Sequence, residues 1–435
     1  MEQAGRGAGA RVQDNARESA LRYDTAGSLD VVGEIPLAVA PGGQGMFSSR
    51  VPADYTANRL SMAIEARRAR GAPIFDLTES NPTRCGFLHD EPALLAALSS
   101  HGALRYEPHA QGLLSARTAV AGYYGEIGAA VDPESLFLTT GTSEAYAQVF
   151  KLLADPDDEI LVPTPGYPLL DVLTGLEAVR LVPYPLRYGT TGWTIDSERL
   201  RAVISTRSRA IVVVSPNNPT GSFLKRGELE DLNALCRDFD LALIVDEVFS
   251  DYGAGVDALR VRTAVGNDAA LTFTLNGFSK LVGLPQMKLG WIHVSGPAGL
   301  VRQARERLAF VTDAYLSVSA AVQHAAPAIL RQRAGVQEQI KRRLEDNSRA
   351  LLDCLSPLSS CQVLSREGGW YSIVKIADDA SDEEFVISLL EEDGVLVHPG
   401  YFYDFPAGTF LVLSLLPPGE TFRQGAASLA RRLRS

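Results

Sequence analysis

The chain has 435 residues, of which 46% are hydrophobic and 21% charged, a balance typical of folded, soluble proteins rather than disordered ones. Its formal net charge of −11 argues against a general nucleic-acid binder, because phosphate backbones are bound by clustered Lys and Arg. No stretch approaches 18 unbroken apolar residues and the first 30 residues lack a continuous apolar region, so we expect neither a membrane span nor a secretory signal.

Cysteine and lysine are both scarce. The 4 cysteines show no C-x-x-C spacing, which predicts reduced thiols in a cytoplasmic protein and argues against a zinc site or any other bound metal. They are Cys85, Cys236, Cys354 and Cys361. Arginine supplies most of the 41 basic residues, so each lysine stands out. Two of them, Lys280 and Lys288, lie close together in the sequence.

The N-terminal part divides into an extension and a joining segment. Residues 1–45 are rich in Gly and Ala and end in P-G-G-Q-G, which predicts a flexible extension. Residues 56–70 have helical character, and 74–77 form a short extended run before the turn S-N-P-T at 80–83. We expect residues 46–90 to join a small domain formed mainly by the C-terminal part.

The central region alternates strand and helix. Short β-branched runs bounded by turn residues, with amphipathic segments between them, are typical of buried parallel strands and crossover helices. The expected strands are 135–140, 159–162, 210–215, 242–246 and 271–275, with a helix at 143–153 after the first. We therefore predict an α/β large domain over residues 91–312, with a mostly parallel sheet flanked by helices.

The C-terminal part has a different pattern. Helical stretches at 299–312 and 320–353 precede strands near 369–376 and 410–415, with a helix between these at 382–393. This order predicts a smaller α+β domain over residues 313–435.

Residues able to carry chemistry follow the predicted central strands. In open α/β sheets ligands bind beyond the carboxyl ends of the strands, so we expect these segments to converge. The T-G-T-S-E turn at 140–144 opens a helix, and it is either a phosphate site or an ordinary helix cap. The other segments are P-T-P-G-Y-P at 163–168, S-P-N-N-P-T-G at 215–221, V-D-E at 245–247 and N-G-F-S-K at 276–280.

Taken together, N-N-P-T-G, D-E-V-F and F-S-K with a basic residue eight positions on resemble the fold-type I pyridoxal-phosphate (PLP) enzymes of the class I/II aminotransferase family. The resemblance covers about residues 46–430 and implies PLP as the cofactor. It implies that Lys280 forms a Schiff base with PLP, that Asp246 pairs with the pyridine nitrogen, and that Asn218 donates to the phenolic oxygen. Tyr167 would stack on the ring.

The same resemblance places the phosphate on Gly141, Thr142 and Ser143, assisted by Lys288. Tyr106, in R-Y-E-P at 105–108, matches a segment that in this family reaches the phosphate of the partner subunit. This implies a homodimer with shared active sites.

Three positions depart from the family pattern. Lys288 replaces the usual phosphate-binding Arg, and Phe249 replaces a Tyr three residues after the pyridine Asp, which removes a donor to the phenolic oxygen. Val412 stands where the family has the Arg that binds the substrate carboxylate. We expect Arg84 and Asn81, in the loop E-S-N-P-T-R at 79–84, to contact the substrate instead. The alternative for Arg84 is an exposed loop residue.

The leading functional hypothesis is an aminotransferase acting on an amino acid and a keto acid. The departures at Phe249 and Val412 motivate an alternative, namely a PLP-dependent lyase, cyclase or carbon–carbon bond-forming enzyme acting for example on S-adenosylmethionine. A third hypothesis is a non-catalytic regulator on the same scaffold, against which the retention of both Lys280 and Asp246 argues.

Overall fold

The computed structural model describes residues 46–52, 57–255, 257–377, 381–405 and 408–434, together with four two-residue strands within 18–36. It divides into two compact units, residues 1–62 and 63–435. In the first unit β1 (Glu18–Ser19) pairs with β4 (Ile35–Pro36), and β2 (Arg22–Tyr23) pairs with β3 (Leu29–Asp30). Apart from these strands, the predicted flexible extension at 1–45 lies outside the described residues. Helix α1 (Arg59–Ala69) spans the boundary between the units.

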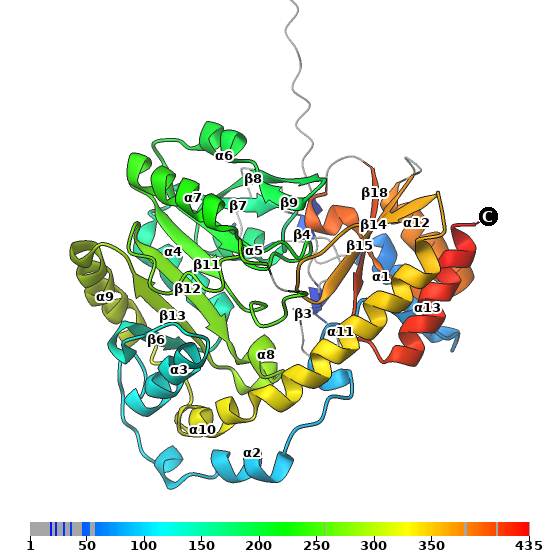
Figure 1. The fold of residues 1–435 in the computed structure, drawn as a ribbon. Coiled ribbons are helices and arrows are strands. Elements are labelled where there is room, and N and C mark those ends of the chain that lie inside the picture. The colour runs from blue at the N-terminus through cyan, green and yellow to red at the C-terminus, as the bar shows by residue number, and fades with distance from the viewer. Residues whose placement is uncertain are drawn as a thin grey trace, which may run out of the picture. The chain divides into compact units, whose positions relative to one another are not determined.

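The second unit is built around an eight-stranded sheet with the order β6-β13-β12-β11-β10-β7-β8-β9 (Figure 1). Strands β6, β12, β11, β10, β7 and β8 run parallel, while β13 and β9 run antiparallel to their neighbours. This confirms the predicted α/β class and the mostly parallel sheet. The bounds are β6 (Leu136–Thr139), β7 (Glu159–Thr164), β8 (Arg180–Gly189), β9 (Gly192–Ile195), β10 (Ser208–Val214), β11 (Ala242–Asp246), β12 (Thr272–Gly277) and β13 (Gly290–Ser295).

Both faces of this sheet are covered by helices, and side chains alternate between them. Along β10, Ala210 and Val212 join an apolar cluster with α4 (Thr142–Leu153) and α9 (Ala298–Asp313), whereas Ile211 and Val213 join a second cluster with α7 (Arg226–Phe239). Because neither face meets water, the strands read as continuous apolar runs. The shorter helices α5 (Leu169–Leu176) and α6 (Ser197–Val203) complete this cover.

A third apolar cluster lies at the β6 end of the sheet. It joins α2 (Glu91–Leu98), α3 (Leu114–Glu126) and α10 (Ala320–Arg331) to side chains of β6 and β13. Phe278 of the short helix α8 (Phe278–Leu281) is fully buried in this cluster. The segment that follows β12 is therefore anchored by its own aromatic residue.

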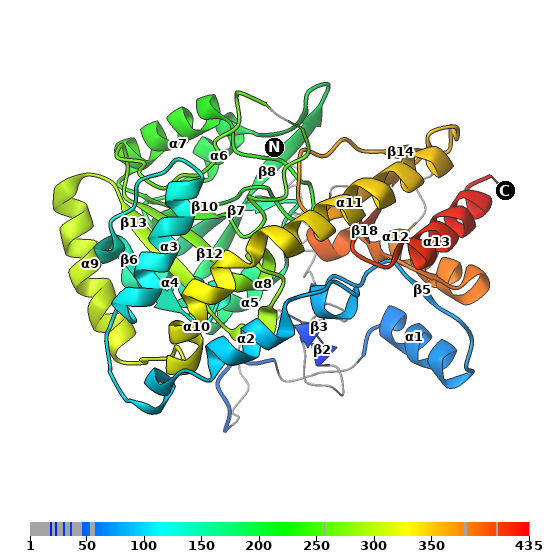
Figure 2. The ribbon, with the colours of Figure 1, turned by 60° about the horizontal axis from the view of Figure 1, so that its bottom comes forward.

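The C-terminal part carries an antiparallel sheet with the order β14-β15-β18-β17. The long helix α11 (Arg333–Leu355) runs from α10 to α13 (Gly419–Arg432), as Figure 2 shows. The helix predicted at 320–353 is thus two helices, α10 and α11, separated at Gln332, whose N–H bonds to the carbonyl of Ile329 three residues back. The sheet strands are β14 (Cys361–Val363), β15 (Tyr371–Ile376), β17 (His398–Pro399) and β18 (Thr409–Ser414).

Further pairing ties early and late segments together. Strand β5 (Phe75–Asp76) pairs in parallel with β16 (Val395–Leu396), and the N–H of Ser414 donates to the carbonyl of Leu77. Helix α12 (Asp382–Ser388) continues as a π-helical turn that ends at Gly394 in a left-handed conformation. The boundaries of the large and small domains stay a prediction. Among the helices described, none is long and apolar enough to cross a bilayer.

Strands β6, β12 and β13 approach one another closely where glycines stand. A Cβ on Gly290 would lie 2.8 Å from the Cα of Gly141 and 3.1 Å from the carbonyl oxygen of Asn276. We expect Gly290→Ala to lower the free energy of unfolding by about 1–3 kcal/mol, because backbone atoms must shift to admit the methyl group. Urea denaturation of the cofactor-free protein measures it.

The matched control is Gly122→Ala in the interior of α3, where a Cβ meets nothing within 4 Å. This variant should raise the free energy of unfolding by about 0.5–1 kcal/mol, since Ala favours a helix over Gly. Equal effects of the two variants would contradict the close approach at Gly290.

Candidate active site

Segments from five parallel strands meet at one edge of the large sheet. Strands β6, β7, β10, β11 and β12 are mutually parallel, so their carboxyl ends lie at the same edge. The turns that follow them carry Gly141, Tyr167, Asn218 and Lys280, and Asp246 is the last residue of β11. The topology thus brings these sequence motifs to a common edge.

Lys280 and Asp246 form the electrostatic centre of this edge. Asp246 is buried, and burial raises its pKa to about 6. Three groups act in the opposite direction and lower this pKa: the N–H of Val248 and the hydroxyl of Tyr146, which each donate to the carboxylate at 3.0 Å, and the charge of Lys280. Burial lowers the pKa of Lys280 to about 8, against the attraction of Asp246. An amine with this pKa is partly unprotonated near neutral pH, which makes it a nucleophile.

Aromatic rings surround the Lys280 side chain. Its Nζ lies 5.3 Å from the ring centre of Trp370 and 5.9 Å from that of Phe249. The hydroxyl of Tyr252 donates to the backbone carbonyl of Lys280 at 2.7 Å. Sequence reasoning missed Trp370, Tyr252 and Tyr146, because nothing in their local pattern separates them from core aromatics.

The N-N-P-T-G turn after β10 is held by its first asparagine. The amide nitrogen of Asn217 donates to the carbonyl of Pro165 at 3.1 Å and to the hydroxyl of Thr220 at 2.9 Å. Asn218 is buried beside it, and its Oδ1 has no hydrogen-bond partner among the described residues. The turn therefore presents a buried, unengaged amide oxygen.

The turn after β6 forms a cradle of the kind that binds anions. Gly141 precedes α4 without any side-chain cap, so N–H groups of the first turn at Thr142 and Ser143 are left for another acceptor. The Nζ of Lys288 would lie 4.0 Å from a Cβ placed on Gly141. A positive helix terminus and an ammonium group thus meet at Gly141.

The remaining sequence-predicted residues lie around this centre or apart from it. Tyr167 follows Gly166, whose N–H donates to the carbonyl of Tyr403 at 3.0 Å. Tyr106 is 81% exposed and borders a cavity of about 90 Å³ that Lys280 and Asp246 do not line. The structure of the single chain therefore leaves Tyr106 outside the Lys280 centre.

The loop predicted to contact substrate reaches the site at Ser80. Ser80 hydrogen-bonds with Tyr371, whose hydroxyl also interacts with Asn218. Arg84 is half-exposed with its guanidinium 3.8 Å from Glu79. The Oδ1 of Asn81 accepts from the N–H and hydroxyl of Thr83, at 3.0 and 2.8 Å, which caps a 3-10 turn.

Val412 lies in the core of the smaller sheet. It is fully buried in β18, in register with Ile373 of β15 and His398 of β17. An aliphatic side chain therefore fills the strand position at which the sequence resemblance leads us to expect an Arg.

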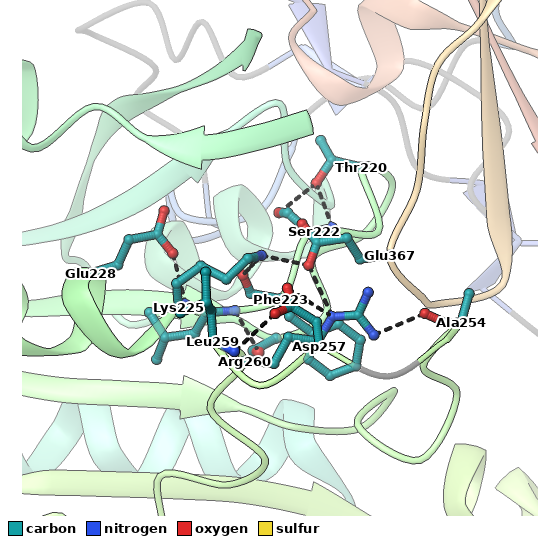
Figure 3. Close-up of polar contacts among 12 residues, drawn as sticks. Thr220, Ser222, Phe223, Lys225, Glu228, Ala254, Asp257, Leu259, Arg260 and Glu367 are labelled. Atoms are coloured by element: carbon teal, nitrogen blue, oxygen red, sulfur yellow. Dashed lines mark hydrogen bonds and ion pairs between the residues drawn. The ribbon is translucent and has the colours of Figure 1, made fainter. Parts of the chain in front are cut away.

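A charge cluster clamps the segment that carries Trp370 (Figure 3). The carboxylate of Glu367 pairs with Lys225 and with Arg260, whose Nε lies 3.2 Å away. The backbone of Glu367 also accepts from the N–H of Ala254 at 2.7 Å and donates to the carbonyl of Gly221 at 3.2 Å. Residues 367–369 are thus tied to both strand-end loops beside Lys280.

Glu367→Gln should lower the free energy of unfolding by about 1–3 kcal/mol, because it removes the carboxylate shared by two partly buried cations and leaves Arg260 with Asp257, at 3.9 Å, as its one carboxylate partner among the described residues. Urea denaturation of the cofactor-free protein gives the value, and the coupling with Lys225→Met in a double-mutant cycle assigns it to the pair. Glu420→Gln is the matched control, since its pair with Arg423 is exposed and should contribute nothing measurable. Equal results for the two glutamates would contradict the clamp.

Comparison with known proteins agrees with this geometry. A family model described as aminotransferase class I and II matches residues 78–416. The chain is 27% identical over 373 residues to a glutamate-pyruvate aminotransferase of Haemophilus influenzae, covering 83% of this chain and 91% of that one. It is 28% identical over 381 residues to an alanine aminotransferase of Mycobacterium bovis, covering 86% of each.

Among solved structures, an aspartate aminotransferase variant of Thermus thermophilus superposes with a TM-score of 0.76 at 26% identity, covering 88% of this chain and 99% of that one. The matched segment, residues 78–416, contains all five strand-end turns and the paired Lys280 and Asp246. The chain belongs to the class I and II aminotransferase family.

Proposed function

We propose that this aminotransferase exchanges amino groups between an amino acid and a keto acid with PLP held covalently at Lys280. The observation that carries the proposal is the half-buried amine of Lys280, with its lowered pKa, beside the buried carboxylate of Asp246 at the carboxyl edge of a parallel sheet. The family membership implies PLP as the cofactor.

The residues present fit PLP at three points. The uncapped first turn of α4, with Lys288 beside it, offers N–H donors and a positive charge suited to the phosphate. Asp246 offers an acceptor for a protonated ring nitrogen, and the buried side-chain amide of Asn218, whose Oδ1 has no partner among the described residues, offers an NH₂ donor for the phenolic oxygen. Tyr167 would pack against the ring.

Bound PLP supplies an electron sink for negative charge that develops on the substrate. Lys280 would take the proton from the substrate α-carbon and return it as a general acid, because its amine is partly unprotonated near neutral pH. Asp246 would hold the ring nitrogen in its protonated form. Tyr146 would keep that carboxylate in position through its 3.0 Å hydrogen bond.

We also propose a homodimer that completes the phosphate site. Tyr106 in the R-Y-E-P segment and Leu104 just before it are 81% and 87% exposed, so both side chains are available for contact with a second subunit. In the dimer Tyr106 would reach the phosphate of the partner subunit. A cytoplasmic location, which the reduced cysteines suggest, is part of the same proposal.

For the substrate carboxylate we propose Arg84 and Asn81. The observation that supports them is the contact of Ser80, in the same loop, with the hydroxyl of Tyr371 beside Asn218. The lyase, cyclase or bond-forming alternative gains no support from the relatives, which are named as aminotransferases.

The first test is chemical trapping. Borohydride reduction of the PLP-loaded protein should fix the cofactor to the peptide that contains Lys280, and Lys280→Ala should abolish both the label and the visible absorbance. Lys341→Ala, in α11, is the control that keeps both. In a separate sample that has not been reduced, alanine or glutamate should convert the bound cofactor to its amine form with release of the keto acid. Unreduced PLP-loaded protein that no amino acid converts would contradict amino-group transfer.

The second test is the pH dependence of cofactor attachment. At pH 8 about half of the Lys280 amines are unprotonated, against less than about 1% of an ordinary lysine, so the rate of PLP attachment to the cofactor-free protein should rise from pH 7 to 9 and then level off. Stopped-flow absorbance gives the rates.

Asp246→Asn tests the sign of this dependence. The negative charge of Asp246 favours the ammonium form of Lys280, so its removal should move the midpoint to lower pH. A midpoint that stays near the ordinary lysine value of about 10.4 in both proteins would contradict the lowered pKa.

A further inference from the structure

The hydroxyls of Tyr146, Tyr252 and Tyr371 each make hydrogen bonds at or beside the Lys280 centre. Tyr146 donates to Asp246 at 3.0 Å, and Tyr252 donates to the backbone carbonyl of Lys280 at 2.7 Å. The third, Tyr371, has its hydroxyl against the side chains of Asn218 and Ser80. The hydroxyl of Tyr371 therefore shares a location with Asn218.

Tyr371 belongs to the group of rings around the Lys280 amine. Its ring centre lies 6.4 Å from that of Phe249, with the two planes at 85°, and Phe249 in turn lies 5.9 Å from the Nζ of Lys280. The backbone of Tyr371 is fixed at the start of β15, in register with Ser414. The ring therefore reaches the site from the smaller sheet.

The neighbours Phe249 and Asn218 leave a place for one more hydrogen-bond donor at the site. Phe249 is buried and carries no hydroxyl, so it cannot donate a hydrogen bond to a phenolate. Asn218 is buried with an unpartnered Oδ1. An anionic oxygen bound at Asn218 would need a second donor in this low-dielectric setting, because a buried charge without partners is costly.

We propose that the hydroxyl of Tyr371, together with Asn218, donates to the phenolic oxygen of the cofactor, in place of the hydroxyl that Phe249 lacks. This inference rests on the proposed binding of PLP at Lys280. Tyr371 is suited to the role because burial raises its pKa, which keeps it a neutral donor at physiological pH. Its contact with Ser80 also links the phenolic oxygen to the loop proposed to bind the substrate.

The consequence is a shift in the acid–base balance of the lysine-bound cofactor. When the linking nitrogen loses its proton, the phenolic oxygen carries an uncompensated negative charge, and a donor stabilises that form. Removing the donor should therefore move the titration to higher pH. The loss of one hydrogen bond to a charged group should shift the titration midpoint by about one pH unit or more.

The experiment is a pH titration of the visible absorbance of the PLP-loaded protein, compared with Tyr371→Phe. We expect the midpoint of the variant to rise by about one pH unit. Tyr124→Phe is the matched control: it removes one buried hydroxyl, which accepts from the Nε1 of Trp291 at 3.0 Å, and it should leave the midpoint unchanged. Thermal unfolding of all three cofactor-free proteins checks that the fold is retained.

The outcomes separate this inference from the proposed function. Absence of a borohydride-sensitive band in the unaltered protein would overturn cofactor binding at Lys280. A band that titrates with the same midpoint in the unaltered protein and in Tyr371→Phe would overturn the role of Tyr371 alone. Equal upward shifts in Tyr371→Phe and Tyr124→Phe would also overturn it, because the effect would then not depend on the contact with Asn218. If Tyr371→Phe does not fold, Asn218→Ala in place of it must show the upward shift.

Discussion

The electrostatic balance between Lys280 and Asp246 is the constraint on which the rest of the site depends. Burial disfavours the charge on both groups, so it lowers the pKa of the amine and raises that of the carboxyl, while their mutual attraction works in the opposite direction. The Tyr146 hydroxyl and the Val248 N–H hold the carboxylate in its charged form. An amine poised in this way is suited to nucleophilic attack, whereas an exposed lysine is not.

Supporting contacts from distant segments keep this pair in a defined environment. The clamp of Glu367 with Lys225 and Arg260 holds residues 367–369 against the loops after β10 and β11, and the next residue, Trp370, lies over the Lys280 amine. Because the charges of this cluster are partly desolvated, the cost of desolvation offsets part of their attraction. The cluster therefore fixes the backbone position of residues 367–369 as much as it stabilises the fold. The rings of Trp370 and Phe249 over the Lys280 amine lower the local dielectric constant, which strengthens the charge interactions beneath them.

The sequence predicted most of the large sheet and the identity of its strand-end motifs. Short β-branched runs gave β6, β7, β10, β11 and β12 to within about two residues, because a strand buried on both faces leaves a continuous apolar pattern. Strand β8 was missed because Pro183 and Pro185 interrupt its run, β9 because it has only four residues, and β13 because Gly290 and His293 interrupt its pattern. The break between α10 and α11 was missed because the residue at the break, Gln332, is neither Gly nor Pro and so gives no local signal for a helix end.

What the sequence determined by itself is the family, the fold class and the residues that follow each central strand, since local pattern and motif spacing are properties of contiguous residues. Tertiary structure alone decided which aromatic rings meet the Lys280 amine. Trp370 and Tyr371 lie some 90 residues further along the chain and arrive through the pairing of β15 with β18 and through the Glu367 clamp. Such long-range contacts leave no local signal, because burial and pKa shifts arise only when separate segments exclude water together.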